Sequence, residues 1–216
     1  MTAGPDAWPL PPLYGLLAAY GGADRGWMEM VLQYDLRLAA VIRSTREDVL
    51  GRIKMTWWHE ALSAEAGTRT GEPLADALTS ALHQRGKGEA LIAMIDGWEE
   101  MLPASEGGET GLRTYAEGRG GGLFRALDAS DQWAAASGAA WALWDLAGQV
   151  DDAVLRDQAM DMGREALSTS TDAAGQPKAL RMLMQLVRRD LQRGSAPPRR
   201  FTAGQYLRLL RASLTA

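Results

Sequence analysis

Residues 24–43 read DRGWMEMVLQYDLRLAAVIR, and their large apolar side chains recur at the spacing of an α-helix. In a helix with 3.6 residues per turn, positions three or four apart share one face. The side chains that share this face are Trp27, Val31, Tyr34, Leu38 and Val41. No period of two accompanies them, so the stretch predicts an amphipathic helix rather than a strand.

The same periodicity recurs on both sides of this stretch, between residues that start or stop helices. Pro73 suits the first turn of a helix that Gly86 ends. Pro177 and Gly194 bracket another helical segment in the same way. Thr45 is the expected N-cap of the helix that follows residue 43. We therefore predict an all-α fold with about eight to ten helices.

The composition limits the class of protein. At 216 residues, with 46% apolar and 23% charged residues, the chain is long enough to bury one core. It contains no cysteine, which excludes disulfides, thiolate metal sites and a cysteine nucleophile. We expect neither a signal peptide, because the N-terminus is proline-rich and lacks a basic region, nor a membrane span, because Asp145 interrupts an apolar run. The expected location is cytoplasmic.

We predict one domain over residues 1–216. Residues 1–12 form a proline-rich lead-in, and residues 195–216 a basic C-terminal helix that starts with a capping box made by Thr202 and Gln205. The last 39 residues contain nine basic side chains and one acid, whereas the whole chain has a net charge of −4. This asymmetry indicates either pairing with the acidic remainder or a separate anionic partner.

The segment VLGRIKMTWWHEAL, residues 49–62, is apolar enough to predict a helix buried on more than one side. Its expected core stripe consists of Leu50, Ile53, Trp57 and Ala61, widened by Met55, Trp58 and Leu62.

A different segment, YAEGRGGGLF, contains three consecutive glycines and predicts a break or kink in a helix over residues 110–127. The favoured interpretation is a place where another helix crosses closely. Backbone binding of a phosphate, with Arg119 meeting the anion, is the alternative.

Three segments, in this order, resemble the squalene/phytoene synthase family. VLGRIKMTWWHEAL is similar to its paired-tryptophan helix, and PLADAL, residues 73–78, to its next helix without the usual His. LIAMIDGWEEML followed by LRTYAEGRGGGLFRAL resembles its Ile-Asp-Gly helix and the Tyr/Gly-containing helix after it. PKALRMLMQLVRRDL, residues 177–191, also fits divergent bacterial members.

This resemblance implies an isoprenoid-synthase-like helical fold around a central cavity. Active members condense two prenyl diphosphates head to head, with Mg²⁺ held by DxxxD carboxylate pairs on two facing helices. Here Asp35 is followed four residues later by Ala39, and Asp145 by Gln149, so both pairs are lost. No metal site and no catalytic residue are therefore assigned. The residues expected to line a remnant substrate cavity are Asp35, Tyr115, Arg119, Asp145 and Gln149.

One intact DxxxD pattern remains, formed by Asp157 and Asp161. Both acids lie among other charged residues, so we interpret them as part of a solvated helix face.

Three functions stay open from the sequence. The first is a non-catalytic binding or assembly module without a cofactor. The second is a divergent prenyltransferase acting on farnesyl- or geranylgeranyl-type diphosphates with Mg²⁺. The third is an unrelated helical interaction protein. The arginine-rich C-terminus favours an anionic membrane surface or an acidic protein as partner, and nucleic acid is not expected because aromatic residues are sparse there.

Overall fold

The periodic segments fold as helices. The computed structural model describes residues 9–45, 47–65, 67–102 and 108–215, and contains no strand within them. The helices are α1 (Pro12–Ala19), α2 (Arg25–Ser44), α3 (Asp48–Ser63), α4 (Pro73–Arg85), α5 (Gly88–Glu99), α6 (Gly108–Tyr115), α7 (Gly122–Ala126), α8 (Asp131–Trp133), α9 (Ala139–Gln149), α10 (Ala153–Ser168), α11 (Lys178–Arg193) and α12 (Ala203–Thr215). A 3₁₀ turn, η1 (Gly22–Asp24), precedes α2.

Two π-helical stretches join four of these elements into two long helices. The stretch η2 (Ala116–Gly121) connects α6 to α7, and η3 (Ala134–Gly138) connects α8 to α9, without an interruption. The described residues therefore form ten helices, which confirms the predicted all-α bundle.

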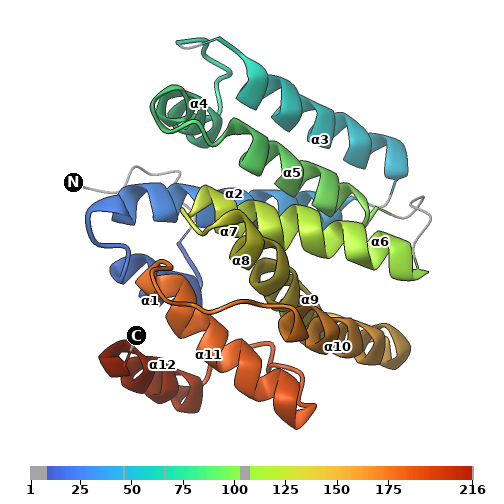
Figure 1. The fold of residues 1–216 in the computed structure, drawn as a ribbon. Coiled ribbons are helices and arrows are strands. Elements are labelled where there is room, and N and C mark those ends of the chain that lie inside the picture. Colours follow the sequence, from blue (N-terminus) through green and yellow to red (C-terminus); the bar gives the residue numbers. More distant parts are fainter. Residues whose placement is uncertain (1–8, 46, 66, 103–107, 216) are drawn as a thin grey trace.

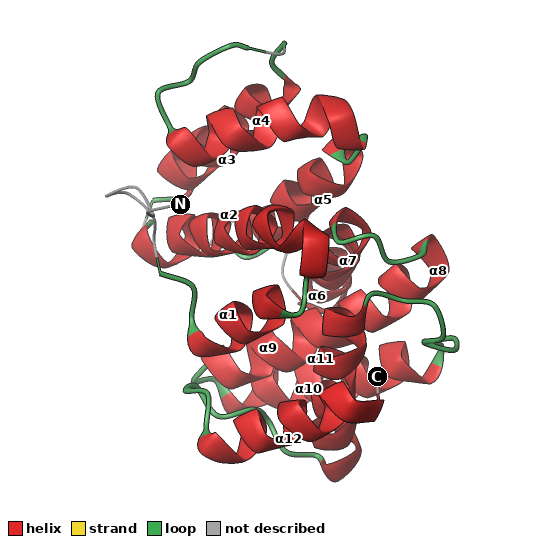
Figure 2. Ribbon diagram, turned by 90° about the vertical axis from the view of Figure 1, so that its left-hand side faces the viewer, coloured by secondary structure: helices red, strands yellow, loops and turns green. Residues whose placement is uncertain are grey.

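The long helix through η2 lies at the centre of the bundle. It contacts α5 on one side and η3 and α9 on the other, so it separates the α3–α5 group from the α9–α12 group (Figures 1 and 2). No helix in the described ranges is both long and apolar enough to cross a membrane.

Most of the predicted helix ends are correct. Gly86 and Gly194 end α4 and α11 in the left-handed conformation that glycine adopts without strain. The capping box before α12 forms, because the Thr202 N–H donates to Gln205 Oε1 at 2.9 Å and the Gln205 N–H to Thr202 Oγ1 at 3.3 Å. The predicted cap at Thr45 is wrong, since the N-cap of α3 is Glu47.

Of the two predicted terminal segments, the C-terminal one can be compared with the structure in more detail. Residues 1–8 of the expected lead-in lie outside the described residues. The C-terminal helix begins at Ala203 rather than at residue 195, and residues 195–202 form a non-helical connection that reaches it.

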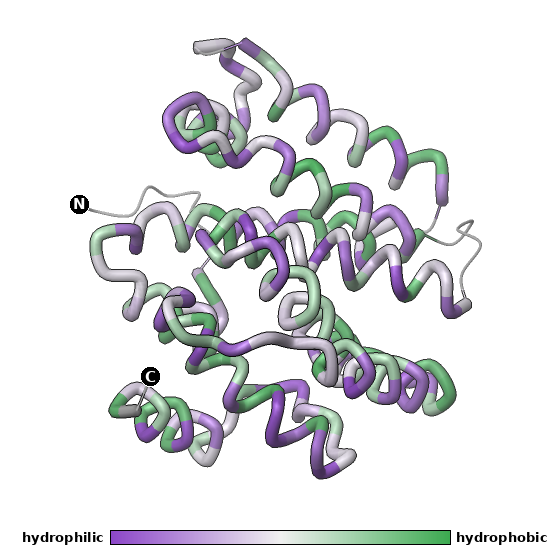
Figure 3. Tube along the Cα trace, viewed as in Figure 1, coloured by the Kyte–Doolittle hydropathy of each residue, from purple (hydrophilic) through white to green (hydrophobic). Residues whose placement is uncertain are grey.

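The predicted core stripe of α3 is wrong for three of its four residues. Leu50, Ile53 and Trp57 are 49%, 58% and 37% exposed. The buried face is the neighbouring one, which consists of Gly51, Met55, Trp58, Ala61 and Leu62. The reason is that α3 lies at the edge of the bundle, where α4 and α5 cover one side only (Figure 3).

The predicted helix break at the glycines is also wrong. The glycines remain helical and instead remove side chains where helices cross. A Cβ atom on Gly120 would collide with the carbonyl oxygen of Gly138, and one on Gly118 would lie 2.8 Å from the Cα of Gly97. The close crossing that the sequence suggested is therefore present, with η3 on one side and α5 on the other.

Candidate functional site

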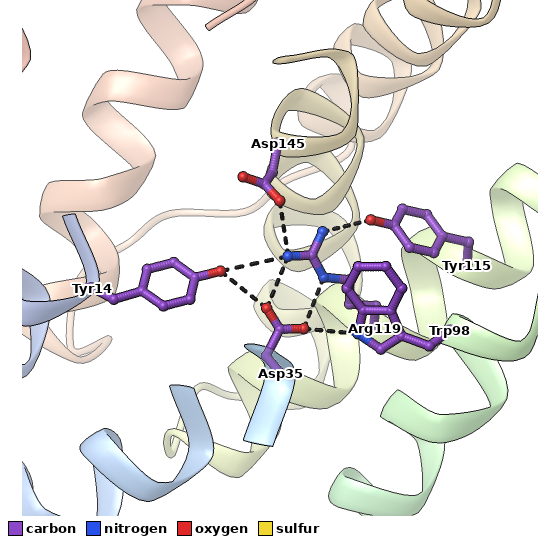
Figure 4. Close-up of polar contacts among 6 residues, drawn as sticks. All are labelled: Tyr14, Asp35, Trp98, Tyr115, Arg119 and Asp145. Atoms are coloured by element: carbon purple, nitrogen blue, oxygen red, sulfur yellow. Dashed lines mark hydrogen bonds and ion pairs between the residues drawn. The ribbon is translucent and has the colours of Figure 1, made fainter. Parts of the chain in front are cut away.

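The π-helical stretch η2 carries a buried arginine, Arg119, between the two glycine crossings. Its side chain is 3% exposed and points away from the crossings into the space between α2, α5 and α9 (Figure 4). A buried guanidinium is costly unless its charge and its donors are matched, so its partners define the site.

Asp35 of α2 is the first partner. The Arg119 Nε and Nη2 atoms donate to Asp35 Oδ1 and Oδ2, each at 2.9 Å, which is the two-pronged geometry that suits arginine and a carboxylate. The same carboxylate accepts from Trp98 Nε1 at 2.9 Å and from the Tyr14 hydroxyl at 3.0 Å. Asp35 is 1% exposed at its side chain, and all four of these bonds are buried.

Asp145 of α9 approaches the guanidinium from the other side. Its Oδ2 atom lies 2.9 Å from Arg119 Nη2, and its side chain is 24% exposed. The remaining guanidinium nitrogen, Nη1, donates to the Tyr115 hydroxyl at 2.5 Å. The cation thus lies between two carboxylates that come from different helices (Figure 4).

Aromatic rings cover the faces of the guanidinium. The Arg119 Cζ atom lies 4.4 Å from the ring centre of Trp98 and 4.6 Å from that of Trp141. Cation–π attraction of this kind adds to the ion pairs when the cation is desolvated.

The charges of the cluster follow from burial and proximity. Burial alone lowers the pKa of Arg119, but the nearby Asp35 and Asp145 carboxylates reverse this and raise it above its ordinary value, so the guanidinium stays charged. Burial raises the pKa of Asp145, and Arg119 offsets part of that increase. Burial also raises the pKa values of Tyr14 and Tyr115, which remain neutral hydroxyls.

The cluster forms the inner wall of a cavity of about 960 Å³. Its lining comes from α1, α2, α5, α6, η2, α9 and α10, from the connection before α12 and from α12 itself. The apolar part of that lining includes Leu36, Ile42, Trp144, Leu146, Val150 and Phe201. Exposed arginines, Arg43, Arg199 and Arg200, line it as well and mark its rim. Its volume and its mainly apolar lining with a few polar groups fall within the range of small-molecule sites in proteins.

All five residues expected from the sequence line this cavity: Asp35, Tyr115, Arg119, Asp145 and Gln149. Arg119 bonds directly to three of the others, Asp35, Tyr115 and Asp145. Gln149 lies nearer the rim, where its backbone carbonyl accepts from Arg199 Nη2 at 3.3 Å.

Sequence reasoning missed Tyr14 and Trp98 as members of the cluster. Trp98 follows the Ile-Asp-Gly motif directly, which was a signal for its position. Tyr14 lies in a short apolar segment, where no motif indicated its position.

The DxxxD pair formed by Asp157 and Asp161 lies elsewhere. Both acids are exposed on α10, and Asp161 pairs with Arg164. This agrees with the solvated face that the sequence predicted.

The inner wall does not fit a magnesium site. Arg119 holds both carboxylates, and the cavity lining at the fourth position after each aspartate is Ala39 or Gln149. Mg²⁺ requires several oxygen ligands in an octahedron. In the described part of the chain, no group of three or more His, Cys, Asp or Glu side chains is placed to hold a metal.

Comparison of the chain with protein-family models, curated proteins and solved structures gave no match. The resemblance to squalene/phytoene synthases therefore stays a prediction from the sequence.

Proposed function

We propose that this protein is a non-catalytic binding module, related to squalene/phytoene synthases, whose cavity holds a ligand with an elongated apolar part. The observation that supports this most strongly is the position of Arg119, which lies between Asp35 and Asp145 and bonds to both. In the enzymes that the sequence resembles, carboxylates of this kind hold Mg²⁺ and so stabilise the departing diphosphate. Here they stabilise a cation that belongs to the chain.

The binding part of the proposal follows from the lining of the cavity. Apolar and aromatic side chains make up most of it, whereas its charged groups are concentrated at the inner wall and at the rim. The inner wall offers neutral tyrosine hydroxyls and a partly exposed Asp145 to a polar group. The arginines at the rim suit an anionic group that remains near solvent.

A divergent prenyltransferase is the second candidate. It is favoured by one observation, which is that the two acidic side chains still face each other across the inner wall (Figure 4). Chemistry on a prenyl diphosphate would require Arg119 to give up at least one of its carboxylate partners. Because Asp35 is held by two parallel bonds in a dry environment, we favour the non-catalytic proposal.

The arginine-rich C-terminal region supports a peripheral location on an anionic membrane surface, and an acidic protein is the alternative partner. Arg199 is bonded to Asp151. The arginines of α11 and α12, on either side of the connection that carries Arg199, form no ion pair with the residues that the structure describes. Internal pairing therefore does not account for their charge. A cytoplasmic location stays a prediction.

The test of binding uses a fluorescent, pyrene-labelled fatty acid as the probe. We expect saturable binding by the parent protein and loss of binding in Ala39→Trp. Ala39 is a buried part of the lining, and the indole ring of tryptophan would fill part of the cavity. Ala77→Trp, at an exposed position of α4, is the matched control. Equal probe binding by parent and Ala39→Trp, both shown to be folded, would contradict the cavity as the site.

The test of catalysis uses labelled farnesyl diphosphate with Mg²⁺. We expect no release of diphosphate and no Mg²⁺-dependent binding in calorimetry. Turnover that Asp35→Ala or Asp145→Ala abolishes would establish the enzyme instead.

A further inference from the structure

The exposed large apolar side chains of this protein form two groups. One lies along α3 and consists of Val49, Leu50, Ile53 and Trp57. The other lies at the opposite end of the bundle, on α12, and consists of Tyr206, Leu207 and Leu214 (Figure 1). Val154, at the start of α10, is exposed as well. Contiguous exposed apolar surface usually marks an interaction site.

Helix α12 has apolar residues on both of its sides. Leu209 and Ala212, at 1% and 5% exposure, lie on the buried side, and α12 packs on α11. Tyr206, Leu207 and Leu214 occur at helical spacing on the opposite side, at 44%, 58% and 86% exposure. Packing within the described residues explains only the first of these two sides.

Basic side chains border the outward apolar side. Arg211 is exposed on α12, and Arg208 lies close enough to Arg189 and Arg193 of α11 that these like charges, after burial, lower the pKa of Arg189. The carboxylate that acts on these three arginines is Asp190, which is 8% exposed and accepts from the Trp144 indole at 3.3 Å. The surface is therefore strongly positive next to its apolar stripe.

The cavity opens at this same end of the molecule. Pro198, Arg199 and Arg200 line the cavity, are exposed, and directly precede α12 in the chain. Across the cavity, Leu155 also lines it, and its neighbour Val154 is 77% exposed. The rim therefore combines exposed apolar and basic side chains, as the outward side of α12 does.

We infer that α12 and the cavity rim dock on an anionic lipid bilayer and that the cavity takes up its apolar ligand from that bilayer. The uptake step rests on the proposed binding function, whereas the docking step does not.

Charge and apolarity together favour a bilayer as the occupant of this surface. An exposed helix side with Leu and Tyr, bordered by arginines, has the pattern of helices that lie in the interface between headgroups and acyl chains. The arginines match phosphate and carboxylate headgroups, and the apolar side chains match the acyl region below them. An acidic protein surface would satisfy the arginines but not the nearly complete exposure of Leu214.

Docking is tested by co-sedimentation with phosphatidylcholine vesicles, with and without phosphatidylserine. We expect the parent to bind only the anionic vesicles, and less at high salt. Arg208→Gln/Arg211→Gln should weaken binding by roughly fivefold for each arginine, and Leu207→Ser/Leu214→Ser by at least about tenfold.

The matched control is Val49→Ser/Ile53→Ser, which removes two apolar side chains, 67% and 58% exposed, from α3 at the other end of the bundle. It should bind like the parent. No binding of the parent to anionic vesicles, an equal loss in the α3 variant, or binding to polyglutamate beads but not to vesicles would overturn the docking inference.

Uptake is tested by the rate at which the pyrene-labelled fatty acid moves from vesicles to the protein. We expect faster transfer from anionic than from neutral vesicles, slower transfer to Leu207→Ser/Leu214→Ser, and none to Ala39→Trp. Binding of the same probe from solution separates the outcomes. If the probe binds from solution but its transfer is independent of vesicle charge and of α12, uptake from the bilayer is wrong; if the probe does not bind from solution, the proposed function is wrong.

Discussion

Replacing Arg119 by methionine tests the organisation of the inner wall most directly. Methionine keeps an unbranched apolar stem but removes the cation, so that Asp35 loses both of its parallel bonds to the guanidinium. Asp35 is 1% exposed and cannot recover the lost stabilisation from water. Breaking a buried ion pair by removing one partner costs about 3–5 kcal/mol, and we expect a loss of unfolding free energy in that range.

Most of this loss is assigned to Asp35 rather than to Asp145. The Asp145 side chain is 24% exposed, so solvent screens its interaction with the guanidinium and can replace part of it.

The assay is urea unfolding at neutral pH, followed by circular dichroism. Arg113→Met is the matched control, because Arg113 lies on the same long helix but forms an exposed pair with Glu109 that contributes about 1 kcal/mol or less. Arg119→Met/Asp35→Asn removes the uncompensated charge while keeping one acceptor oxygen for Trp98 or Tyr14, and should recover much of the stability. A loss for Arg119→Met no larger than that for Arg113→Met, or no recovery in the double variant, would refute the account of a buried, charge-matched cluster.

Three further predictions concern the core, the helix crossings and pH. Trp58→Ala should lower the unfolding free energy by about 3–5 kcal/mol and Trp57→Ala by less than half of that, because only Trp58 is buried; equal urea midpoints would contradict this. Gly120→Ala should cost about 1–3 kcal/mol or more, whereas Gly15→Ala, which meets nothing within 4 Å, should stabilise by about 0.5–1 kcal/mol; thermal melts compare the two. Because burial raises the pKa of Asp145 above its ordinary 3.8, its contribution to stability is fully present below that value and is lost as pH rises through the raised pKa. As pH rises from below 3.8 through the raised pKa, the urea midpoint should fall for the parent and change less for Asp145→Asn.

The helical class could be predicted because local signals and packing agree. Gly86, Gly194 and the Thr202–Gln205 capping box end or begin helices by backbone effects that need no tertiary contact. Periodicity alone could not show which side of α3 is buried, because apolar residues occupy both sides and the choice depends on where α4 and α5 lie.

The predicted helix break failed for a related reason. Helix propensity counts against glycines one residue at a time, whereas here Gly118 and Gly120 allow two neighbouring helices to approach. The stability gained from that packing is a tertiary effect, and only its location could be predicted from the glycines.

The sequence pointed to part of the cluster's membership, without Tyr14 and Trp98, and to none of its arrangement. Asp35 and Asp145 could be named because they are acids within apolar segments, and Arg119 because it lies beside the glycine run. Their pairing could not be predicted, because Asp35, Arg119 and Asp145 lie far apart in the chain and meet only when three helices pack together.

The cation between Asp35 and Asp145 is part of the polypeptide, so one positive charge is always present at the inner wall of the cavity. A bound metal ion exchanges with its surroundings, so its occupancy depends on supply and on competing chelators. The guanidinium of Arg119 is present in every folded molecule, because it cannot dissociate or be removed by a chelator. The positive charge between Asp35 and Asp145 therefore does not depend on the supply of divalent ions.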